Sequence, residues 1–221
     1  MLDVALQCGW MVRVALAAIA VAVLPGTLTV LAWYPRASFS LLECLSLGLA
    51  VGLGLNELLT IAAIGVHWSA GVSLAILAGL VLLSAVPAWR RRRAITLAPG
   101  ETVAIATLVV LSVGLYAVGS RYDNVEDRIH IAIAERLAYL PAPSFRTLYY
   151  SPGVVYTYPF PGTHYLVALI ARAGSMPVLF AYAKLRPLWG CAALVLLYGC
   201  ARRLFDSHLL AIAVLLTSRS E

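Results

Sequence analysis

The sequence predicts an all-α membrane protein: a polytopic transmembrane helical bundle with an extracytoplasmic loop that carries interfacial helices. Composition is the first observation, because the 221 residues are 62% hydrophobic and only 12% charged. Soluble domains carry about 25% charged residues. The second observation is the mean hydropathy of +0.91. The third is that the apolar residues form long blocks, with arginine runs beside them. The lipid bilayer is therefore the first partner that we expect.

We count six apolar segments, most of them close to the roughly 20 residues that a membrane-spanning helix needs. They cover residues 14–33, 44–66, 70–89, 102–118 and 185–204, and a last one begins near His208. The first is longer than the apolar part of a signal peptide, which has about 7–15 residues. Its Pro25-Gly26 pair is tolerated in a membrane helix as a kink.

These segments divide the chain into three expected parts. Residues 1–118 hold four transmembrane helices, residues 119–184 form the loop, and residues 185–221 hold helices five and six. The last segment has only about ten apolar residues before the chain ends, which is too short to span comfortably. We therefore expect that the 221 residues are the N-terminal part of a longer protein, or that the chain stops in the middle of a domain. Gly48 and Gly52 give one small-xxx-small spacing, which indicates close helix packing.

Arginine clusters predict the orientation in the cell (plasma or inner) membrane. Loops rich in Lys and Arg stay on the cytoplasmic side. The run Arg90–Arg93 and the pair Arg202-Arg203 agree, because two spans separate them. The long loop between those spans then lies outside. Because most of the +6 net charge is arginine beside apolar spans, we expect no nucleic-acid partner.

The start of this loop, YDNVEDRIHIAIAERL from Tyr122 to Leu137, is acidic and compatible with a helix. Its first turn carries Asp123, Glu126 and Asp127, and its apolar positions recur at i, i+4 and i+8. An amphipathic helix at the membrane interface fits this pattern. Acidic residues also belong at helix N-termini as caps, so spacing alone leaves capping and catalysis both open.

A second motif, YTYPFPGTHYLVALI, follows at residues 156–170. Its prolines and Gly162 break the chain just before a second apolar helix, which we expect to begin near Thr163 with His164 in its first turn. Tyrosines such as Tyr158 are ordinary at a membrane–water boundary. They are equally suited to stack against a sugar beside the acidic cluster.

Together these motifs resemble the first outer loop of GT-C membrane glycosyltransferases. The matching pieces are Glu126-Asp127 with IAIAERL, then YPFPGTHYLVALIA, then KLRPLWGCAALVLLYGCARRLFDSHLLAIAVLL, over about residues 120–217. The resemblance implies a polyprenyl-phosphate-linked sugar donor used at the outer face, with a glycan or protein acceptor. It implies an acidic catalytic base or metal ligand near the start of the loop, which maps to Asp127 first, then Glu126 and Asp123.

In that reading, a carboxylate removes the proton of the acceptor hydroxyl as C1 is attacked, which inverts the anomeric centre. Arg128, Arg136 or a divalent cation, Mg²⁺ or Mn²⁺, held by Asp127 and Glu126 would balance the phosphate charge. The residues expected to bind substrate are Arg128, His130, Arg136, Tyr158 and His164. His130 and His164 have no third partner at metal-ligand spacing, so we expect no zinc site.

Two other classes of function remain open. Glu57, beside Asn56, falls near the middle of the second apolar segment, where an ionisable group is costly and is a functional candidate by default. A transporter would use Glu57 as its intramembrane coupling residue. A packing role for a protonated or hydrogen-bonded Glu57 is the plain alternative. A non-catalytic membrane assembly subunit would tolerate loss of every carboxylate in the loop.

Overall fold

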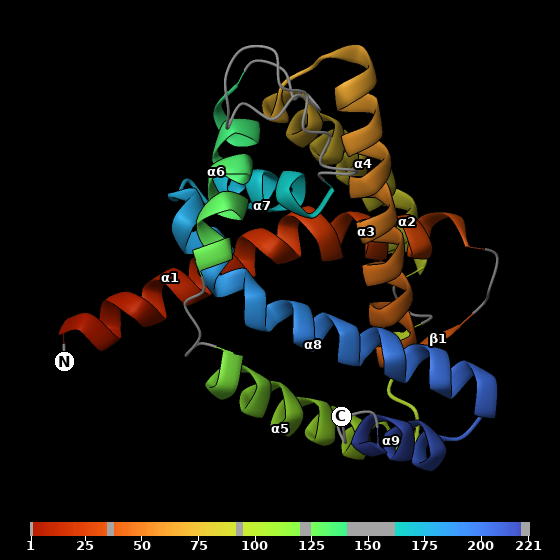
Figure 1. The fold of residues 1–221 in the computed structure, drawn as a ribbon. Coiled ribbons are helices and arrows are strands. Elements are labelled where there is room, and N and C mark those ends of the chain that lie inside the picture. Colours follow the sequence, from red (N-terminus) through yellow and green to blue (C-terminus); the bar gives the residue numbers. More distant parts are fainter. Residues whose placement is uncertain (1, 35–37, 92–94, 120–124, 141–161, 218–221) are drawn as a thin grey trace. The chain divides into compact units, whose positions relative to one another are not determined.

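The computed structural model describes residues 2–34, 38–91, 95–119, 125–140 and 162–217 (Figure 1). These residues are almost entirely helical, which confirms the all-α fold class. The helical segments are α1 (Leu2–Ala18), η1 (Ile19–Val23), α2 (Leu24–Trp33), α3 (Leu41–Val66), α4 (Ala70–Arg91), α5 (Glu101–Gly119), α6 (Val125–Tyr139), α7 (Gly162–Ala173), α8 (Val178–Phe205) and α9 (His208–Thr217). Two short strands, β1 (Phe39–Ser40) and β2 (Ile95–Thr96), pair in parallel.

Four of the described helices are long and apolar enough to cross a membrane: Gly9–Trp33, Leu41–Val66, Ala70–Arg90 and Val178–Phe205. These correspond to the first, second, third and fifth predicted spans. The first helix starts at Leu2 and α8 starts at Val178, both earlier than the apolar blocks predict. Polar residues such as Lys184 can join an apolar helix where their stems lie along it. The predicted fourth and last spans correspond to the shorter apolar helices Glu101–Leu115 and His208–Thr217.

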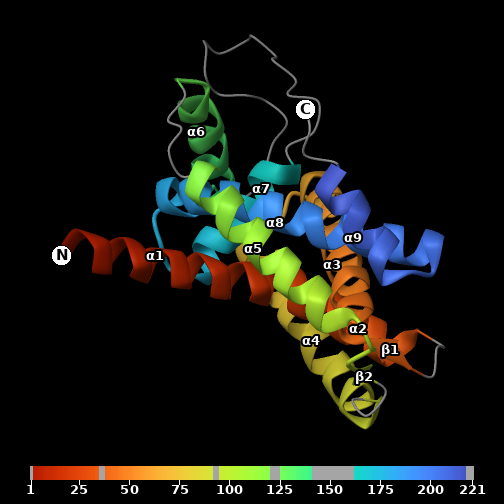
Figure 2. The ribbon, with the colours of Figure 1, turned by 90° about the horizontal axis from the view of Figure 1, so that it is seen from below.

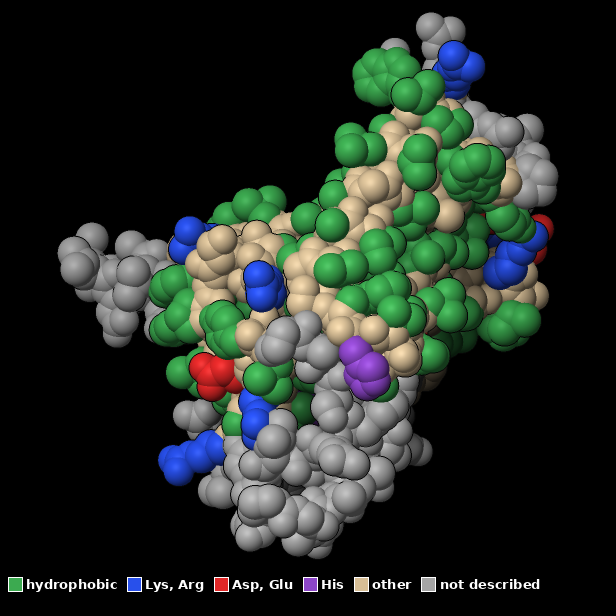
Figure 3. Space-filling model, turned by 90° about the horizontal axis from the view of Figure 1, so that it is seen from above, with side chains coloured by type: hydrophobic (Ala, Val, Ile, Leu, Met, Phe, Trp, Pro, Cys, Tyr) green, Lys and Arg blue, Asp and Glu red, His purple; other side chains and the backbone are tan. Residues whose placement is uncertain are grey.

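Exposed apolar side chains fit a lipid environment. Hydrophobic side chains cover most of the described face in Figure 3. Leu82, Leu83 and Val110 are among the most exposed, at 73%, 74% and 69%. Soluble monomers rarely expose apolar patches of this extent, whereas lipid-facing helices require them. The structure therefore supports the bilayer as the partner of these helices.

The described helices belong to two compact units, each built from three stretches of chain. Unit 1 contains residues 1–21, 54–79 and 123–185, and unit 2 contains residues 22–53, 80–122 and 186–221. The basic residues that the predicted orientation places in the cytoplasm, such as Arg90, Arg202 and Arg203, all belong to unit 2. The division into three successive parts stays a prediction.

In unit 2, the buried carboxylate of Glu101 joins two helix starts. Its Oε1 accepts from the Leu42 N–H at the start of α3, at 2.9 Å, and its Oε2 accepts from the Ala98 N–H, at 2.9 Å. Helix N-termini leave unpaired N–H groups that a carboxylate satisfies. Glu101 therefore ties the start of α3 to the segment that precedes α5.

Helices α2 and α3 pack backbone to backbone in unit 2. A Cβ atom at Gly52 would overlap the carbonyl oxygen of Ala22, and one at Gly26 would overlap that of Gly48. Small residues allow this approach in membrane helices, where van der Waals packing drives association. The packing role indicated by the Gly48 and Gly52 spacing is therefore confirmed.

The orientation yields a testable prediction of its own. A cysteine at position 92 should be protected from an impermeant thiol reagent in intact cells, whereas one at position 150 should be labelled. Both positions lie outside the described residues, so the expectation rests on the arginine clusters. The measurement is labelling before and after lysis, in a chain whose native cysteines are replaced. Labelling of position 92 in intact cells would contradict the whole orientation.

Candidate functional site

Helices α6 and α7 form the candidate site in unit 1, where both views show them side by side (Figures 1 and 2). The sequence prediction of one helix over residues 126–137 and another from about Thr163 is confirmed. Alanines favour the helix in α6, and Ala134, Leu137 and Ala138 are its buried face. Helix α7 is buried along nearly its whole length, so α6 rests against a well-packed helix.

The two helices meet at a pair of histidines. Nδ1 of His130 on α6 lies 2.8 Å from Nε2 of His164 on α7, and the ring centroids are 5.0 Å apart at 27°. The ring of Tyr182, from the start of α8, stacks on His130 at 6.2 Å and 13°. One nitrogen of the pair therefore donates a hydrogen bond and the other accepts it. The contact joins residues that are 34 positions apart.

His164 is the buried member of this pair and is only 6% exposed. Burial, and to a smaller extent the charge of His130, lowers the pKa of His164 to about 4. A neutral imidazole carries one donor and one acceptor nitrogen. His164 is therefore neutral at physiological pH, and it can accept a hydrogen bond from His130 whenever His130 is protonated.

A second set of polar contacts holds α7 in place in unit 1. The hydroxyl of Tyr165, fully buried, lies 2.7 Å from Ser73 Oγ on α4. The Trp68 Nε1–H donates to the same Ser73 oxygen at 3.0 Å. At the other end of α7, Arg172 donates to the carbonyl oxygen of Ala138 at 2.8 Å. Buried polar networks of this kind fix orientation, so the rotation of α7 that presents His164 is well determined.

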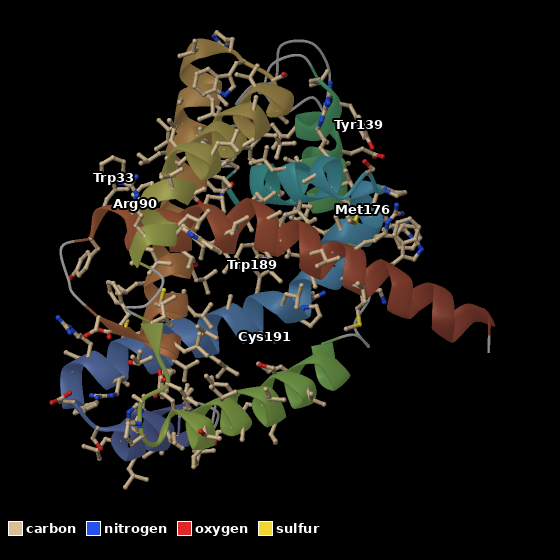
Figure 4. All side chains as sticks on the ribbon, turned by 180° about the vertical axis from the view of Figure 1, so that it is seen from behind. Trp33, Arg90, Tyr139, Met176, Trp189 and Cys191 are labelled. Carbon is tan, nitrogen blue, oxygen red and sulfur yellow. The ribbon has the colours of Figure 1, made fainter. Side chains whose placement is uncertain are left out.

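Side chains around the end of α7 complete this packing. Met176, labelled in Figure 4, is buried just after α7, whereas Tyr139 at the end of α6 is 63% exposed. In α1, Trp10 stacks on Phe180 with ring centroids 4.7 Å apart, and Arg13 lies over the Trp10 ring at 5.3 Å. These aromatic contacts tie the start of α8, which carries Tyr182, to α1.

The predicted site residues fall into three groups. Asp123 and Tyr158 lie outside the described residues. Glu126 and Asp127 lie in the first turn of α6, but their side chains are outside the described part of the chain. Arg128 is exposed near the start of α6, and Arg136 is partly buried in its last turn. Eight residues of helix separate the two arginines by about 12 Å, so they serve different ends of α6. His130 and His164 are brought together.

Sequence reasoning missed several residues that shape this site. Nothing in the spacing connects Tyr182 with His130, because the contact crosses two helices and a loop. The sequence does not indicate the contact between Ser73 and Tyr165 either. A single serine in an apolar helix is common, and a tyrosine such as Tyr165 is ordinary at the membrane–water boundary. One feature of the sequence does bear on the site: Tyr165 directly follows His164. A hydrogen bond that fixes Tyr165 therefore also fixes the position of His164.

Among the described side chains, no group of three or more His, Cys, Asp or Glu residues could hold a metal ion. Glu126 and Asp127 fall outside that set. Elsewhere in unit 1, Glu57 Oε2 is buried and has no hydrogen-bond partner among the described residues. Its neighbour Asn56 donates to the Val21 carbonyl oxygen at 3.0 Å, where the π-helical segment η1 interrupts the first span.

Comparison of the chain with protein-family models, curated proteins and solved structures found no match.

Proposed function

We propose that this chain is part of a GT-C-like membrane glycosyltransferase of the cell envelope. It would move a sugar from a polyprenyl-phosphate-linked donor to a glycan or protein acceptor at the outer membrane face. One observation supports this proposal most strongly: the His130–His164 contact, which draws together the starts of α6 and α7. Those helices carry two of the three segments on which the resemblance rests, and the acidic turn lies one turn before His130.

In this proposal Asp127 is the catalytic base, with Glu126 and Asp123 as its close alternatives. The base takes the proton of the acceptor hydroxyl as the acceptor oxygen attacks C1. The bond from C1 to the phosphate oxygen breaks on the opposite side, so the anomeric centre inverts. The phosphate leaves with the electron pair of that bond.

Positive charge must stabilise the departing phosphate. Arg128 suits this task better than Arg136, because it is exposed and lies next to Asp127 in the first turns of α6. Its planar guanidinium binds two phosphate oxygens at once. Glu126 and Asp127 also supply the oxygen ligands that Mg²⁺ prefers, and a cation held there would add to the same charge.

The membrane explains why such a site sits beside spanning helices. A polyprenyl tail remains in the bilayer, while its phosphate and sugar reach the interface. Exposed apolar side chains of a spanning helix within unit 1, such as Ile61 and Val66 of α3, would give a lipid-linked donor an apolar approach. His130, His164 and Tyr158 are then available for the sugar and the acceptor.

Reconstitution of the full-length protein tests this function. Proteoliposomes that contain the purified protein are given a polyprenyl-phosphate sugar labelled in the sugar, together with a cell-envelope extract as acceptor. We expect labelled product to accumulate with the anomeric configuration opposite to that of the donor. Full-length protein that transfers no sugar from any of a panel of polyprenyl-phosphate donors would contradict the proposal.

A transporter is the second candidate, and one observation favours it. The buried Glu57 Oε2 has no hydrogen-bond partner in the described part of the chain, in the α3 span and next to Asn56. An ionisable group inside a span usually faces a partner or a pathway. If Glu57 couples transport, coupled uptake should depend on it and not on the acidic turn of α6.

A further inference from the structure

Three side chains of unit 1 stack on one another where α1 meets the start of α8. The rings of Trp10 and Phe180 are parallel to within 1°, with centroids 4.7 Å apart, and the guanidinium carbon of Arg13 lies 5.3 Å from the centroid of the Trp10 ring. We infer that this stack binds the phosphate of an anionic phospholipid in the outer leaflet. The inference goes beyond the proposed function and does not depend on it.

The stack holds Arg13 in place before a ligand binds. Side chains on an α-helix point toward its N-terminus, so Arg13 reaches back over Trp10, which lies one turn earlier on α1. A guanidinium is attracted to the face of an indole ring within about 6 Å. Phe180 of α8 in turn fixes the Trp10 ring. A long side chain loses rotamer freedom when it binds a ligand, and a side chain that already lies on a ring loses less.

The positive charge of Arg13 is available to an anion. The Arg13 side chain is exposed, and no described carboxylate lies within ion-pair distance of it. A guanidinium is always charged, and its fork of N–H donors matches two oxygens of a phosphate. An anionic phospholipid would neutralise this charge. A zwitterionic phospholipid suits the site less well, because it brings a positive charge of its own.

The surroundings of Arg13 indicate that the ligand also has apolar chains. Val12 and Leu16 lie beside Arg13 on α1, and both are mostly exposed. Arg13 is four residues after Gly9, the first residue of the candidate span, which is about 6 Å along the helix axis. Arginines near the end of a span extend to the level of the lipid headgroups. The guanidinium therefore reaches a phosphate there, while acyl chains cover the apolar side chains below it.

The predicted orientation determines the leaflet. The run Arg90–Arg93 places the end of the third span in the cytoplasm. The first span runs in the same direction as the third, so it begins at the outer face. Arg13 lies near that beginning, which places the site in the outer leaflet.

Lipid titration of the purified, delipidated full-length protein tests this inference. Phosphatidylglycerol is the probe, and binding is followed by native mass spectrometry and by the rise in unfolding temperature, since a ligand stabilises the folded state that it binds. We expect Arg13→Gln to weaken binding by about tenfold, which is typical for loss of hydrogen bonds to a charged group. Without lipid, its unfolding temperature should equal that of the wild type, because the side chain is exposed.

Two further variants separate the stack from charge alone. Arg13→Lys keeps the charge but loses the planar fork, so its affinity should fall between those of the wild type and Arg13→Gln. Arg90→Gln is the matched control, because it removes the same charge from an exposed arginine in unit 2, and it should bind phosphatidylglycerol with the wild-type affinity.

Four results would overturn the inference and leave the glycosyltransferase proposal standing. The first is wild-type affinity in Arg13→Gln, and the second is an equal loss in Arg90→Gln, which would indicate an effect of net charge. The third is equally tight binding of phosphatidylcholine or inorganic phosphate. The fourth is displacement of phosphatidylglycerol by an equimolar amount of polyprenyl phosphate, which would assign the stack to the sugar donor instead.

Discussion

Asp127→Asn is expected to abolish glycosyl transfer while the protein stays folded in the membrane. The amide is nearly isosteric with the carboxylate but cannot accept the acceptor's proton. Loss of a general base costs about 100-fold to 10,000-fold in rate. Position 127 is the third residue of α6, so the change removes a favourable interaction of a carboxylate with the helix dipole, which is worth only about 0.3–1 kcal/mol. The measurement is the initial rate of sugar transfer in proteoliposomes, together with the thermal unfolding temperature of each variant.

Glu135→Gln is the matched control for that variant. Glu135 lies on the same helix, two turns further on, and its side chain is exposed. It should transfer sugar at the wild-type rate. Glu126→Gln and Asp123→Asn should lower the rate less than Asp127→Asn. If Glu126→Gln has the stronger effect, Glu126 rather than Asp127 is the catalytic base. Wild-type rates in all three variants of the acidic turn would refute the catalytic role of this loop.

Gly52→Ala is expected to have the largest effect on folding. Its new Cβ would overlap the Ala22 carbonyl oxygen, and that atom belongs to the backbone. No side-chain rotation relieves such an overlap, so η1 and α3 must move apart. Overpacking of this kind costs about 1–3 kcal/mol. We expect a value near 3 kcal/mol from unfolding of the detergent-solubilised protein.

Gly54→Ala is the control on the same helix. A Cβ at Gly54 meets nothing within 4 Å. Because alanine is a better helix former than glycine, this variant should be as stable as the wild type or slightly more so. Equal loss of stability in both variants would contradict this account, because a Cβ meets the Ala22 carbonyl oxygen at position 52 but nothing at position 54.

The helices of this chain were largely predictable from the sequence, because long runs of apolar residues predict membrane-spanning helices. Residues 44–66 and 70–89 predict α3 and α4 to within a few residues. Helix ends were less predictable. Helix α8 begins at Val178, ahead of the predicted apolar block that starts at residue 185, because Lys184 keeps helical backbone despite its charge. The start of α5 depends on Glu101, whose partners Ser40 and Leu42 lie 59 or more residues earlier in the chain.

The candidate site was predictable only in part. Composition and turn residues placed His130 and His164 on two successive helices, and the break before Gly162 predicted where α7 begins. Their contact at 2.8 Å depends on how α7 is rotated, and that rotation is set by Ser73 and Trp68 on a distant hairpin. Periodicity in a sequence indicates which face of one helix is apolar, but it does not indicate which side chains of two different helices are in contact. Tyr182 illustrates the same point, because only the fold brings it to His130.

The most direct test of the glycosyltransferase proposal compares Asp127→Asn and Glu57→Gln in one reconstituted, full-length preparation. Sugar transfer and coupled uptake are measured on the same proteoliposomes. We predict that Asp127→Asn loses transfer, and that Glu57→Gln transfers sugar normally with at most altered stability or expression. The reason is distance, since half of a roughly 30 Å apolar core separates the bilayer midplane from the interface. A dead Glu57→Gln beside a fully active Asp127→Asn would contradict the proposal and favour a transporter.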